Sequence, residues 1–384
     1  MRSSLLCLTL LAVAAVVANG EDTLPSAQPC RAASCSIPEC QCSSTSNSLG
    51  LAPKDTPQFV TLTFDDAVTI NNIETYKKLI YDRKNANGCP IGTTFFVSHE
   101  YTNYQLVNDL YNHGFEIALH SITHRSNQTY WARASYEDIA KEIGEQKEQL
   151  SYFSNIPISE IKGVRAPFLQ TSGNPFYQVI KDYDLLYDSS RPTVTYRNPG
   201  LWPYTLDYAS TQDCPIGPCP TASIPGVWVT PLISWADLEG FPCSFVDACV
   251  FTPNHDDEDA WYEFILENFE RQYDGTRAPF GFYIHEWYLS IHPAVLRALN
   301  RFIDTITKLD DVFMVNEKEV IEWTKNPVNV EEYRTKNCKT ISPSPCSSPH
   351  VCTLTAEHNG VEYWMSVCTA CPLVYPWLGN SLGK

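Results

Sequence analysis

Two short stretches of the sequence place histidines and carboxylates where they could bind a metal ion. His120 and His124 are four residues apart in HSITH, and Asp65 and Asp66 are adjacent in TFDD. Two imidazoles and a carboxylate, with open coordination positions, suit a catalytic divalent cation, zinc above all. We therefore predict Asp66, His120 and His124 as metal ligands. Each pair alone has a simpler explanation, because unrelated surface histidines also show this spacing and two adjacent aspartates also form turns or helix caps.

Further residues could complete a hydrolytic site around such an ion. A bound metal lowers the pKa of water toward neutrality, so Asp65, held beside Asp66, could act as the base. Arg165 in RAPF could pair with Asp65 and keep it ionised. The backbone N–H of Phe168, in the turn after Pro167, could help to bind a developing oxyanion.

A second acid–base pair and one aromatic residue extend the candidate site. His285 in FYIHEW follows an apolar run and could protonate a leaving nitrogen, while Asp188 in YDSS could hold that imidazole and raise its pKa. Trp202 could form the floor of a sugar subsite. The alternatives are a core histidine with satisfied hydrogen bonds and a core tryptophan.

Strand-like and helix-like segments that could position these residues alternate through residues 51–327. We expect strands at 59–64, 92–98, 115–121, 161–168, 185–190, 226–232, 280–287 and 311–316. We expect helices at 71–83, 103–114, 135–153, 174–183, 256–275 and 292–308, with Ser135 and Asp138 as a capping box. This alternation indicates an α/β fold with a parallel sheet, and eight strands favour a distorted TIM-like (β/α) barrel over a doubly wound open sheet. All the candidate catalytic and metal-binding residues stand at or near strand ends, where barrel enzymes carry their active sites.

The segments on either side of this region indicate a secreted protein. Residues 1–20 combine a basic start, an apolar run and small residues at the end, which predicts a signal peptide; a membrane anchor is the alternative, but the run is short and has no basic flank after it. Residues 21–50 and 328–384 are rich in cysteine, and a long insertion at about 191–255 carries four more. Of 15 cysteines, 14 remain after residue 20, an even number that suits an oxidised protein.

Composition narrows the set of partners. The chain has 27 basic and 44 acidic residues, a net charge of -17, which makes nucleic acid and other polyanions poor ligands. A neutral substrate or a cationic product is compatible with this charge. No later apolar segment is long enough to span a membrane. We expect a secreted monomer that binds neither nucleic acid nor a membrane, with Asn127 as a glycosylation site if it is exposed.

Five ordered motifs give the sequence a family resemblance over residues 55–325. They are TFDD (63–66), HSITH (120–124), RAPF (165–168), YDSS (187–190) and FYIH (282–285). In order and spacing they resemble the motifs of the polysaccharide deacetylases of carbohydrate esterase family four, the NodB-homology domain. The insertion LWPYTLDY and the cysteine-rich ends resemble insect chitin deacetylases, within them the gut-associated group that has no separate chitin-binding module.

This resemblance implies an activity and a role for each motif residue. The activity is metal-dependent removal of N-acetyl groups from the GlcNAc units of chitin, which yields chitosan and acetate. By motif position, the implied roles are base for Asp65, metal ligands for Asp66, His120 and His124, orienting residue for Arg165, acid for His285 and partner of that acid for Asp188. Tyr283 replaces the leucine that usually stands two residues before the catalytic histidine, which alters the pocket for the acetyl methyl group or the neighbourhood of that pocket. Two alternatives remain: a non-catalytic chitin-binding or matrix-organising protein on the same fold, and a deacetylase of another acetylated polysaccharide.

Cysteine parity adds one structural prediction. If Cys214 pairs with Cys219, Cys243 with Cys249, and the four cysteines of residues 21–50 among themselves, Cys89 is left with five cysteines of the C-terminal segment. We therefore predict a bond from Cys89 to that segment, at Cys338, which would tie residues 328–384 to the barrel.

Overall fold

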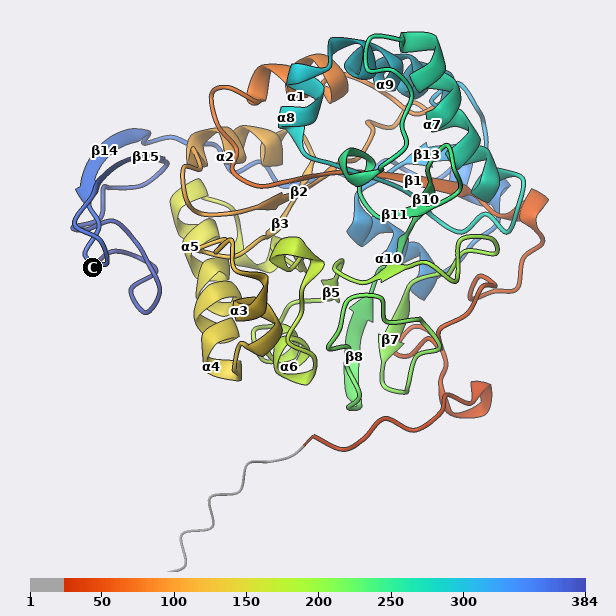
Figure 1. Cartoon of the computed structure of the whole chain (residues 1–384), viewed down its shortest axis with the longest axis horizontal. Coiled ribbons are helices and arrows are strands. Elements are labelled where there is room, and N and C mark those ends of the chain that lie inside the picture. Colours follow the sequence, from red (N-terminus) through yellow and green to blue (C-terminus); the bar gives the residue numbers. More distant parts are fainter. Residues whose placement is uncertain (1–23) are drawn as a thin grey trace, which may run out of the picture.

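The computed structural model describes residues 24–384, and eight parallel strands form its centre (Figure 1). They are β1 (Gln58–Asp65), β2 (Thr94–Val97), β3 (Glu116–Leu119), β4 (Gly163–Val164), β5 (Tyr187–Asp188), β8 (Ile224–Val229), β12 (Phe280–Ile284) and β13 (Val312–Met314). Each corresponds to one of the strands expected from the sequence. Their hydrogen-bonded order is β12-β1-β2-β3-β4-β5-β8, and β13 pairs with the first residues of β1.

The strands form a barrel that is distorted on one side. β8 does not pair with β12 in the described sheet, and it pairs instead with the antiparallel strand β7 (Tyr204–Leu206). The chain after β8 fills the gap, because β9 (Leu232–Ile233) lies against β12 and the indole Nε1 of Trp235 donates to the carbonyl of Gly281 at 2.8 Å. The predicted distorted (β/α) barrel is confirmed, and the doubly wound open sheet is not formed.

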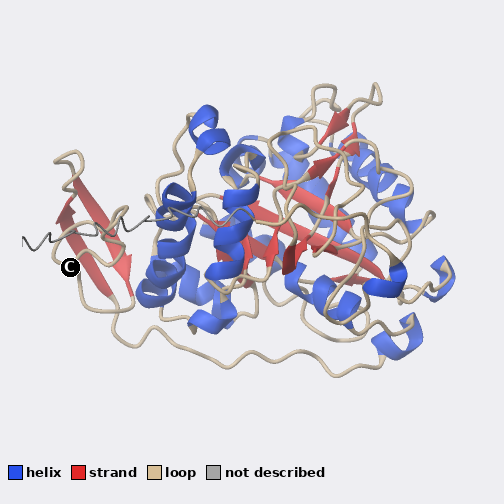
Figure 2. Cartoon of the chain, turned by 90° about the horizontal axis from the view of Figure 1, so that it is seen from below, coloured by secondary structure: helices blue, strands red, loops and turns tan. Residues whose placement is uncertain are grey.

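Helices surround this barrel, and one of them, α10 (Glu317–Lys325), packs Ile321 into the barrel interior (Figures 1 and 2). They are α1 (Ile73–Ile80), α2 (Tyr104–Asn112), α3 (Gln128–Arg133), α4 (Tyr136–Ile139), α5 (Glu145–Ser154), α6 (Asn174–Asp182), α7 (Glu258–Tyr273), α8 (Glu286–Ile291), α9 (Pro293–Ile306), α10 (Glu317–Lys325) and α11 (Val330–Arg334). The insertion contributes β6 (Pro192–Thr193), β10 (Trp235–Ala236) and β11 (Pro242–Cys243), and the C-terminal segment forms a hairpin of β14 (His350–Thr355) and β15 (Glu362–Val367). The expected capping box is present, with Ser135 and Asp138 bonded to each other's backbone N–H.

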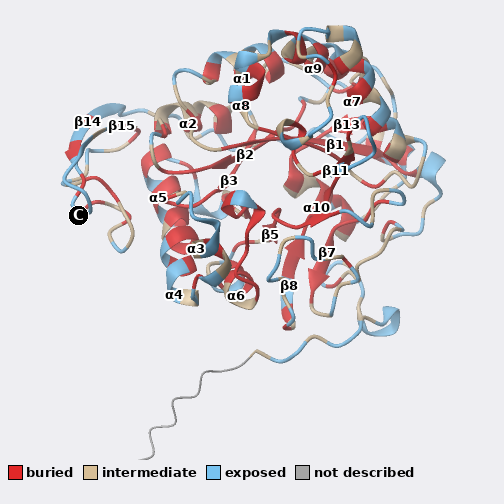
Figure 3. Ribbon diagram, in the orientation of Figure 1, coloured by how far each residue is buried: buried red, intermediate tan, exposed pale blue. Residues whose placement is uncertain are grey.

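The barrel strands are buried along their length (Figure 3), and their alternate side chains form two buried sets. One set faces the helices, so that Leu62 and Phe64 of β1 share an apolar cluster with Tyr76 of α1. The other set faces the barrel interior, because successive residues of a strand point to opposite sides. The interior cluster consists of Phe96, Ala118, Tyr187, Trp228 and Ile321, with Leu186 packed against it.

Seven disulfides connect all fourteen cysteines of residues 24–384. They are Cys30–Cys42, Cys35–Cys40, Cys89–Cys338, Cys214–Cys219, Cys243–Cys249, Cys346–Cys368 and Cys352–Cys371. The predicted Cys89–Cys338 bond is therefore present, and both bonds expected within the insertion are also present. This number of disulfides fits an extracellular protein.

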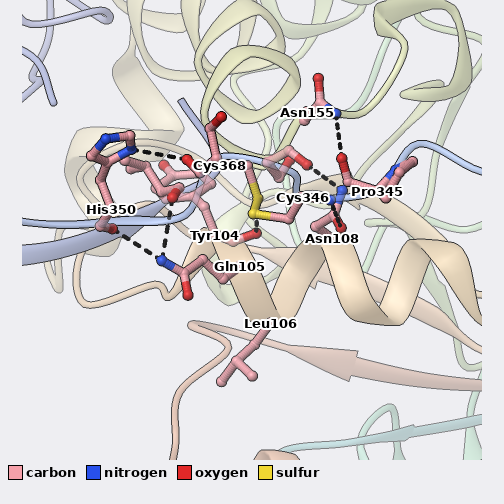
Figure 4. Close-up of a disulfide and its surroundings, with 12 residues drawn as sticks. Tyr104, Gln105, Leu106, Asn108, Asn155, Pro345, Cys346, His350 and Cys368 are labelled. Atoms are coloured by element: carbon pink, nitrogen blue, oxygen red, sulfur yellow. Dashed lines mark hydrogen bonds between the residues drawn. A yellow bond between two sulfur atoms is a disulfide. The ribbon is translucent and has the colours of Figure 1, made fainter. Parts of the chain in front are cut away.

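The C-terminal hairpin docks on helix α2 (Figures 2 and 4). The N–H of Cys346 donates to the side-chain oxygen of Asn108 at 3.1 Å, and Asn108 Nδ2 donates to Ser344 O and Ser154 O at 2.7 Å each. Gln105 Nε2 donates to the carbonyl of His350 at 3.0 Å. The segment thus contacts the barrel through specific polar bonds as well as through the Cys89–Cys338 disulfide.

Two expectations from the sequence concern targeting. The predicted signal peptide, residues 1–20, lies outside the described residues. Within residues 24–384, no helix combines the length and the apolar character needed to cross a bilayer. Asn127 is exposed at the start of α3, where its side-chain oxygen accepts from the N–H groups of Thr129 and Tyr130.

Candidate active site

Polar residues gather where the barrel strands end. Asp65 is the last residue of β1, and His120, Arg165 and His285 directly follow β3, β4 and β12. Because successive side chains of a strand point to opposite faces, these residues point toward the barrel axis. Asp65 reaches two of them, with 2.6 Å from its Oδ1 to Arg165 Nη1 and 3.6 Å from its Oδ2 to His120 Nε2. The structure therefore brings residues of separate strands together at the C-terminal face of the barrel, as the sequence predicts.

Asp66, His120 and His124 form a cluster that fits a divalent cation. One ligand atom of each residue lies within 4.8 Å of those of the other two, and Asp66 Oδ1 is 3.3 Å from His124 Nε2 and 3.9 Å from His120 Nε2. Two ligands of a tetrahedral zinc are about 3.3 Å apart, given bonds of about 2.0 Å. His120 donates from Nδ1 to the Arg165 carbonyl at 2.8 Å, which leaves its Nε2 lone pair for a metal. Burial lowers the pKa of His120 to about 4, so the imidazole is neutral at physiological pH.

Asp65 lies beside this triad and is held there by Arg165. Both side chains are buried, and the ion pair joins them at 2.6 Å. Burial alone would raise the pKa of Asp65, but the charge of Arg165, with smaller contributions from His120 and His285, holds this pKa below its usual value. An ionised carboxylate beside the metal cluster can accept a proton.

The guanidinium of Arg165 has an acceptor for each of its five N–H donors. Nε donates to the Ser189 carbonyl at 2.7 Å, Nη1 to Thr63 Oγ1 and Asp65 Oδ1, and Nη2 to Ser189 Oγ and Glu317 Oε1. Burial raises the pKa of Glu317 to about 7. Because removing one partner of a buried ion pair costs about 3–5 kcal/mol, this network fixes the position of Arg165 and, through it, of Asp65.

His285 is paired with Asp247, a residue that sequence reasoning missed. Asp247 Oδ2 lies 2.6 Å from His285 Nδ1 and also accepts the His285 N–H at 3.2 Å. Burial by itself lowers the pKa of His285, but the hydrogen bond and charge of Asp247 outweigh it, and the pKa rises to about 9. The ring of Phe245 stacks on the imidazole at 5.0 Å between centroids. At neutral pH the structure therefore holds a protonated imidazole whose Nε2 has no hydrogen-bond partner among residues 24–384.

The prediction that Asp188 partners His285 is wrong. Asp188 lies on β5 one position after the inward-facing Tyr187, so the strand alternation turns it outward, and its Oδ2 accepts from the hydroxyl of Tyr177 on α6 at 2.8 Å. Asp247 lies in a short turn between Cys243 and Cys249, and the disulfide-closed loop carries it to the barrel mouth. Two signals in the sequence could have corrected the assignment. The alternation of side chains along the strand turns Asp188 outward, and the loop between Cys243 and Cys249 contains Asp247.

Comparisons with known proteins identify the family of the chain. The family described as Polysaccharide deacetylase matches residues 52–185. A family 4 carbohydrate esterase from Streptomyces lividans aligns in structure with a TM-score of 0.37 and 16% identity, covering 67% of this chain and 91% of that one. The chain is 57% identical to Bombyx mori "Chitin deacetylase 8" over 383 residues, 100% of both proteins, and 37% identical to Bombyx mori "Chitin deacetylase 1" over 377 residues, 93% of this chain and 69% of that protein.

This chain belongs to the polysaccharide deacetylase family. The resemblance to insect chitin deacetylases that the insertion and the cysteine-rich ends indicate is confirmed by the two Bombyx mori relatives. The protein is therefore a deacetylase, an enzyme of a family that is generally metal-dependent.

Phe168 lies beside the metal cluster of the deacetylase. Its backbone is left-handed, with φ 57°, and its ring lies 5.5 Å from that of His124. Among the hydrogen bonds of residues 24–384, its N–H donates to no protein oxygen, whereas the N–H groups of Leu169 and Gln170 are used within the turn. Asp66 and His124 also have positive φ, 79° and 42°. Such conformations cost about 1–3 kcal/mol each and are typical of functional sites.

Neither of the two residues expected to bind substrate lies at the surface of the deacetylase. Trp202 is fully buried and packs on Trp323, 5.2 Å between ring centroids, in an apolar cluster with Phe59 near the start of β1. Tyr283 is also buried, because it faces inward on β12 and its ring lies 5.1 Å from the guanidinium of Arg165. The expectation that Trp202 floors a sugar subsite is therefore wrong, because Trp202 belongs to the core. Tyr283 packs against Arg165 and Phe245 next to the site, and its effect on the acetyl pocket or its neighbourhood stays a prediction.

Proposed function

We propose that the protein is a secreted, zinc-dependent chitin deacetylase, which hydrolyses the N-acetyl groups of GlcNAc residues in chitin to chitosan and acetate. Residues 51–327 form its catalytic domain. The cysteine-rich segment 328–384 is linked to this domain by the Cys89–Cys338 disulfide, and the segment 21–50 is closed by two disulfides of its own. The observation that carries the proposal is the arrangement of one metal-binding triad, one ionised carboxylate and one protonated imidazole at the same barrel mouth.

The metal-binding residues are Asp66, His120 and His124. A zinc ion held by them supplies Lewis-acid chemistry, lowering the pKa of water and polarising the acetyl carbonyl. Two imidazoles and one carboxylate are borderline ligands that suit zinc and leave positions open for water and substrate.

The remaining residues move protons and stabilise charge. Asp65 accepts a proton from the attacking water, and Arg165 keeps its carboxylate ionised and in place. The free N–H of Phe168 donates to the oxygen that becomes negative in the tetrahedral transition state. His285, protonated through Asp247, then gives its proton to the leaving amine nitrogen of the sugar. Acetate and the free amine are the products.

Two exposed aromatic rings indicate where the sugar chain lies. Phe168, 45% exposed, is next to His124, and Trp287, 52% exposed, lies nearly parallel to the ring of His285 at 6.5 Å. Aromatic faces pack against the C–H faces of pyranose rings. A chain of GlcNAc units that crosses the mouth between these rings would present one N-acetyl group to the metal cluster and the acid.

A substrate panel tests the proposed substrate. Purified protein loaded with zinc is offered GlcNAc oligomers of two to six units, acetylated xylan and peptidoglycan fragments, and released acetate is measured. We expect acetate from the GlcNAc oligomers. Release from acetylated xylan or peptidoglycan alone would refute the chitin substrate, and no release from any of them would refute the enzyme proposal.

A further inference from the structure

The helix behind the metal-binding loop contains a π-helical turn. Helices α4 and α5 form one continuous helix over 136–154, and between them the residues Ala140–Gly144 adopt π-helical geometry. The N–H of Glu145 donates to the carbonyl of Ala140, five residues earlier instead of four. Such turns are rare and are found frequently at functional sites. The extra residue rotates one half of the helix relative to the other by about 100° compared with a regular α-helix.

Two buried residues of this helix hold the backbone between His120 and His124. The carboxylate of Glu142 accepts from the N–H of Thr123 at 2.9 Å and from its hydroxyl at 2.6 Å, and the Glu142 carbonyl accepts the N–H of Ile122 at 3.0 Å. The side chain of Gln146 accepts the N–H of Ser121 at 2.8 Å and donates to the Ser121 carbonyl at 2.8 Å. The three loop residues between the two histidines are therefore all bonded to Glu142 or Gln146.

The loop itself lacks a regular structure that could fix the histidines. Ser121 and His124 both have positive φ, 77° and 42°, so the two ligands do not stand on successive turns of one helix. The His124 N–H donates to Ser121 Oγ at 3.0 Å, which makes the position of the second ligand depend on that of Ser121. Ser121 and Thr123 are buried, and a buried N–H without an acceptor costs about 1–3 kcal/mol. The helix thus supplies acceptors that the loop conformation requires.

We propose that Glu142, in the π-helical turn, and Gln146, two residues after it in α5, are positioning residues for the metal site, which set the spacing of His120 and His124. The inference rests on the proposed metal-dependent function, because it assumes that these histidines hold the ion. Partners that orient metal ligands from outside the coordination shell contribute about 10–100-fold to metal affinity. Removing either side chain lets the loop relax and lowers the affinity of the apo protein for zinc by that factor.

The test is the zinc affinity of Glu142→Ala and Gln146→Ala in the purified full chain. Affinity is measured by competition with a chromophoric chelator, and thermal unfolding and circular dichroism of the apo proteins show whether each variant is folded. Glu148→Ala is the matched control, because Glu148 is exposed on the same helix and its side chain makes no hydrogen bond among the described residues. We expect zinc dissociation constants raised about 10–100-fold in both test variants and unchanged in the control.

A second readout separates positioning from a general loss of stability. Cobalt(II) in place of zinc gives visible bands that depend on coordination geometry, and these bands should change in the two test variants and not in Glu148→Ala. Glu142→Gln keeps the volume and one acceptor oxygen, so it should restore part of the lost affinity; this variant replaces Glu142→Ala if the latter does not fold. Wild-type zinc affinity in the folded test variants, together with a normal binding of zinc by the wild type, would overturn this inference alone. A wild-type protein that binds no zinc would overturn the proposed function as well.

Discussion

The substitution Asp247→Asn tests the acid–base chemistry of the site, because the size of its effect on the pKa of His285 can be predicted. Asp247 is the first contributor that raises the pKa of His285, which lies at about 9 against the usual 6.5. This difference corresponds to about 3 kcal/mol between the two protonation states. Asparagine keeps the shape and one acceptor but removes the charge, and the smaller effects of Asp65 and Asp66 remain. We therefore expect the pKa of His285 to fall to about 7 or below.

The pH profile of kcat for acetate release measures this shift. The acid must be protonated, so activity is present below the pKa of His285 and lost as the pH rises through it. At pH 8.5 the protonated fraction falls from about three quarters at a pKa of 9 to about 3% at a pKa of 7, a loss of about 25-fold, whereas the loss at pH 6 should be small. The alkaline limb of the profile should move by about two pH units.

Asp188→Asn is the matched control for this experiment. Asp188 is a buried carboxylate that bonds to Tyr177 and does not touch His285, so its alkaline limb should stay in place. A limb that does not move in Asp247→Asn, or that moves equally in Asp188→Asn, would refute the assignment of Asp247 as the partner of the acid.

Three further predictions concern the metal, the disulfides and the aromatic residues. Asp66→Asn should raise the zinc dissociation constant, measured by chelator competition; an unchanged constant would remove Asp66 from the ligand set. Replacing both Cys89 and Cys338 by serine removes a bond between residues 249 positions apart and should lower the free energy of unfolding, measured by denaturant titration, by about 2–5 kcal/mol. The kcat should be unchanged, because the bond lies before β2, at the end of the barrel opposite the site. Trp287 is exposed, so Trp287→Ala should raise KM for GlcNAc oligomers about tenfold at unchanged Tm. Trp202 is in the core, so Trp202→Phe should lower Tm at unchanged KM. The reverse pattern would contradict both placements.

Much of the barrel could be predicted because its strands carry strong local signals. The apolar, β-branched runs that end in polar residues marked β1, β3 and β12 and also the ends where function lies. The missing β8–β12 pairing could not be predicted, because it depends on how the insertion folds back. The capping box at Ser135 could be predicted from its residue types. The π-helical turn that begins five residues later could not, because it depends on contacts with a loop that lies elsewhere in the sequence.

The metal-binding residues could be predicted from their residue types and spacing. The partner of His285 and the sugar-binding tryptophan could not, because their roles depend on the direction in which each side chain points. The metal cluster of Asp66, His120 and His124 is compact in the structure as expected. Asp188 has the right chemistry at the right strand end, but the alternation of β5 turns it away from His285. The residue type of Trp202 suggested a sugar-binding surface, but the side chain is buried in the core and cannot contact a sugar.

The central claim is that Asp65 performs proton transfer beside a zinc held by its neighbours. Acetate release from a GlcNAc pentamer is measured for wild type and Asp65→Asn, each first stripped with a chelator and then reloaded with zinc, with bound zinc determined in the same samples. We expect stripping to abolish wild-type activity and reloading to restore it, while Asp65→Asn binds zinc equally well and releases acetate about 10²–10⁴-fold more slowly. Wild-type turnover by zinc-loaded Asp65→Asn, or full wild-type activity after complete removal of the metal, would contradict this claim.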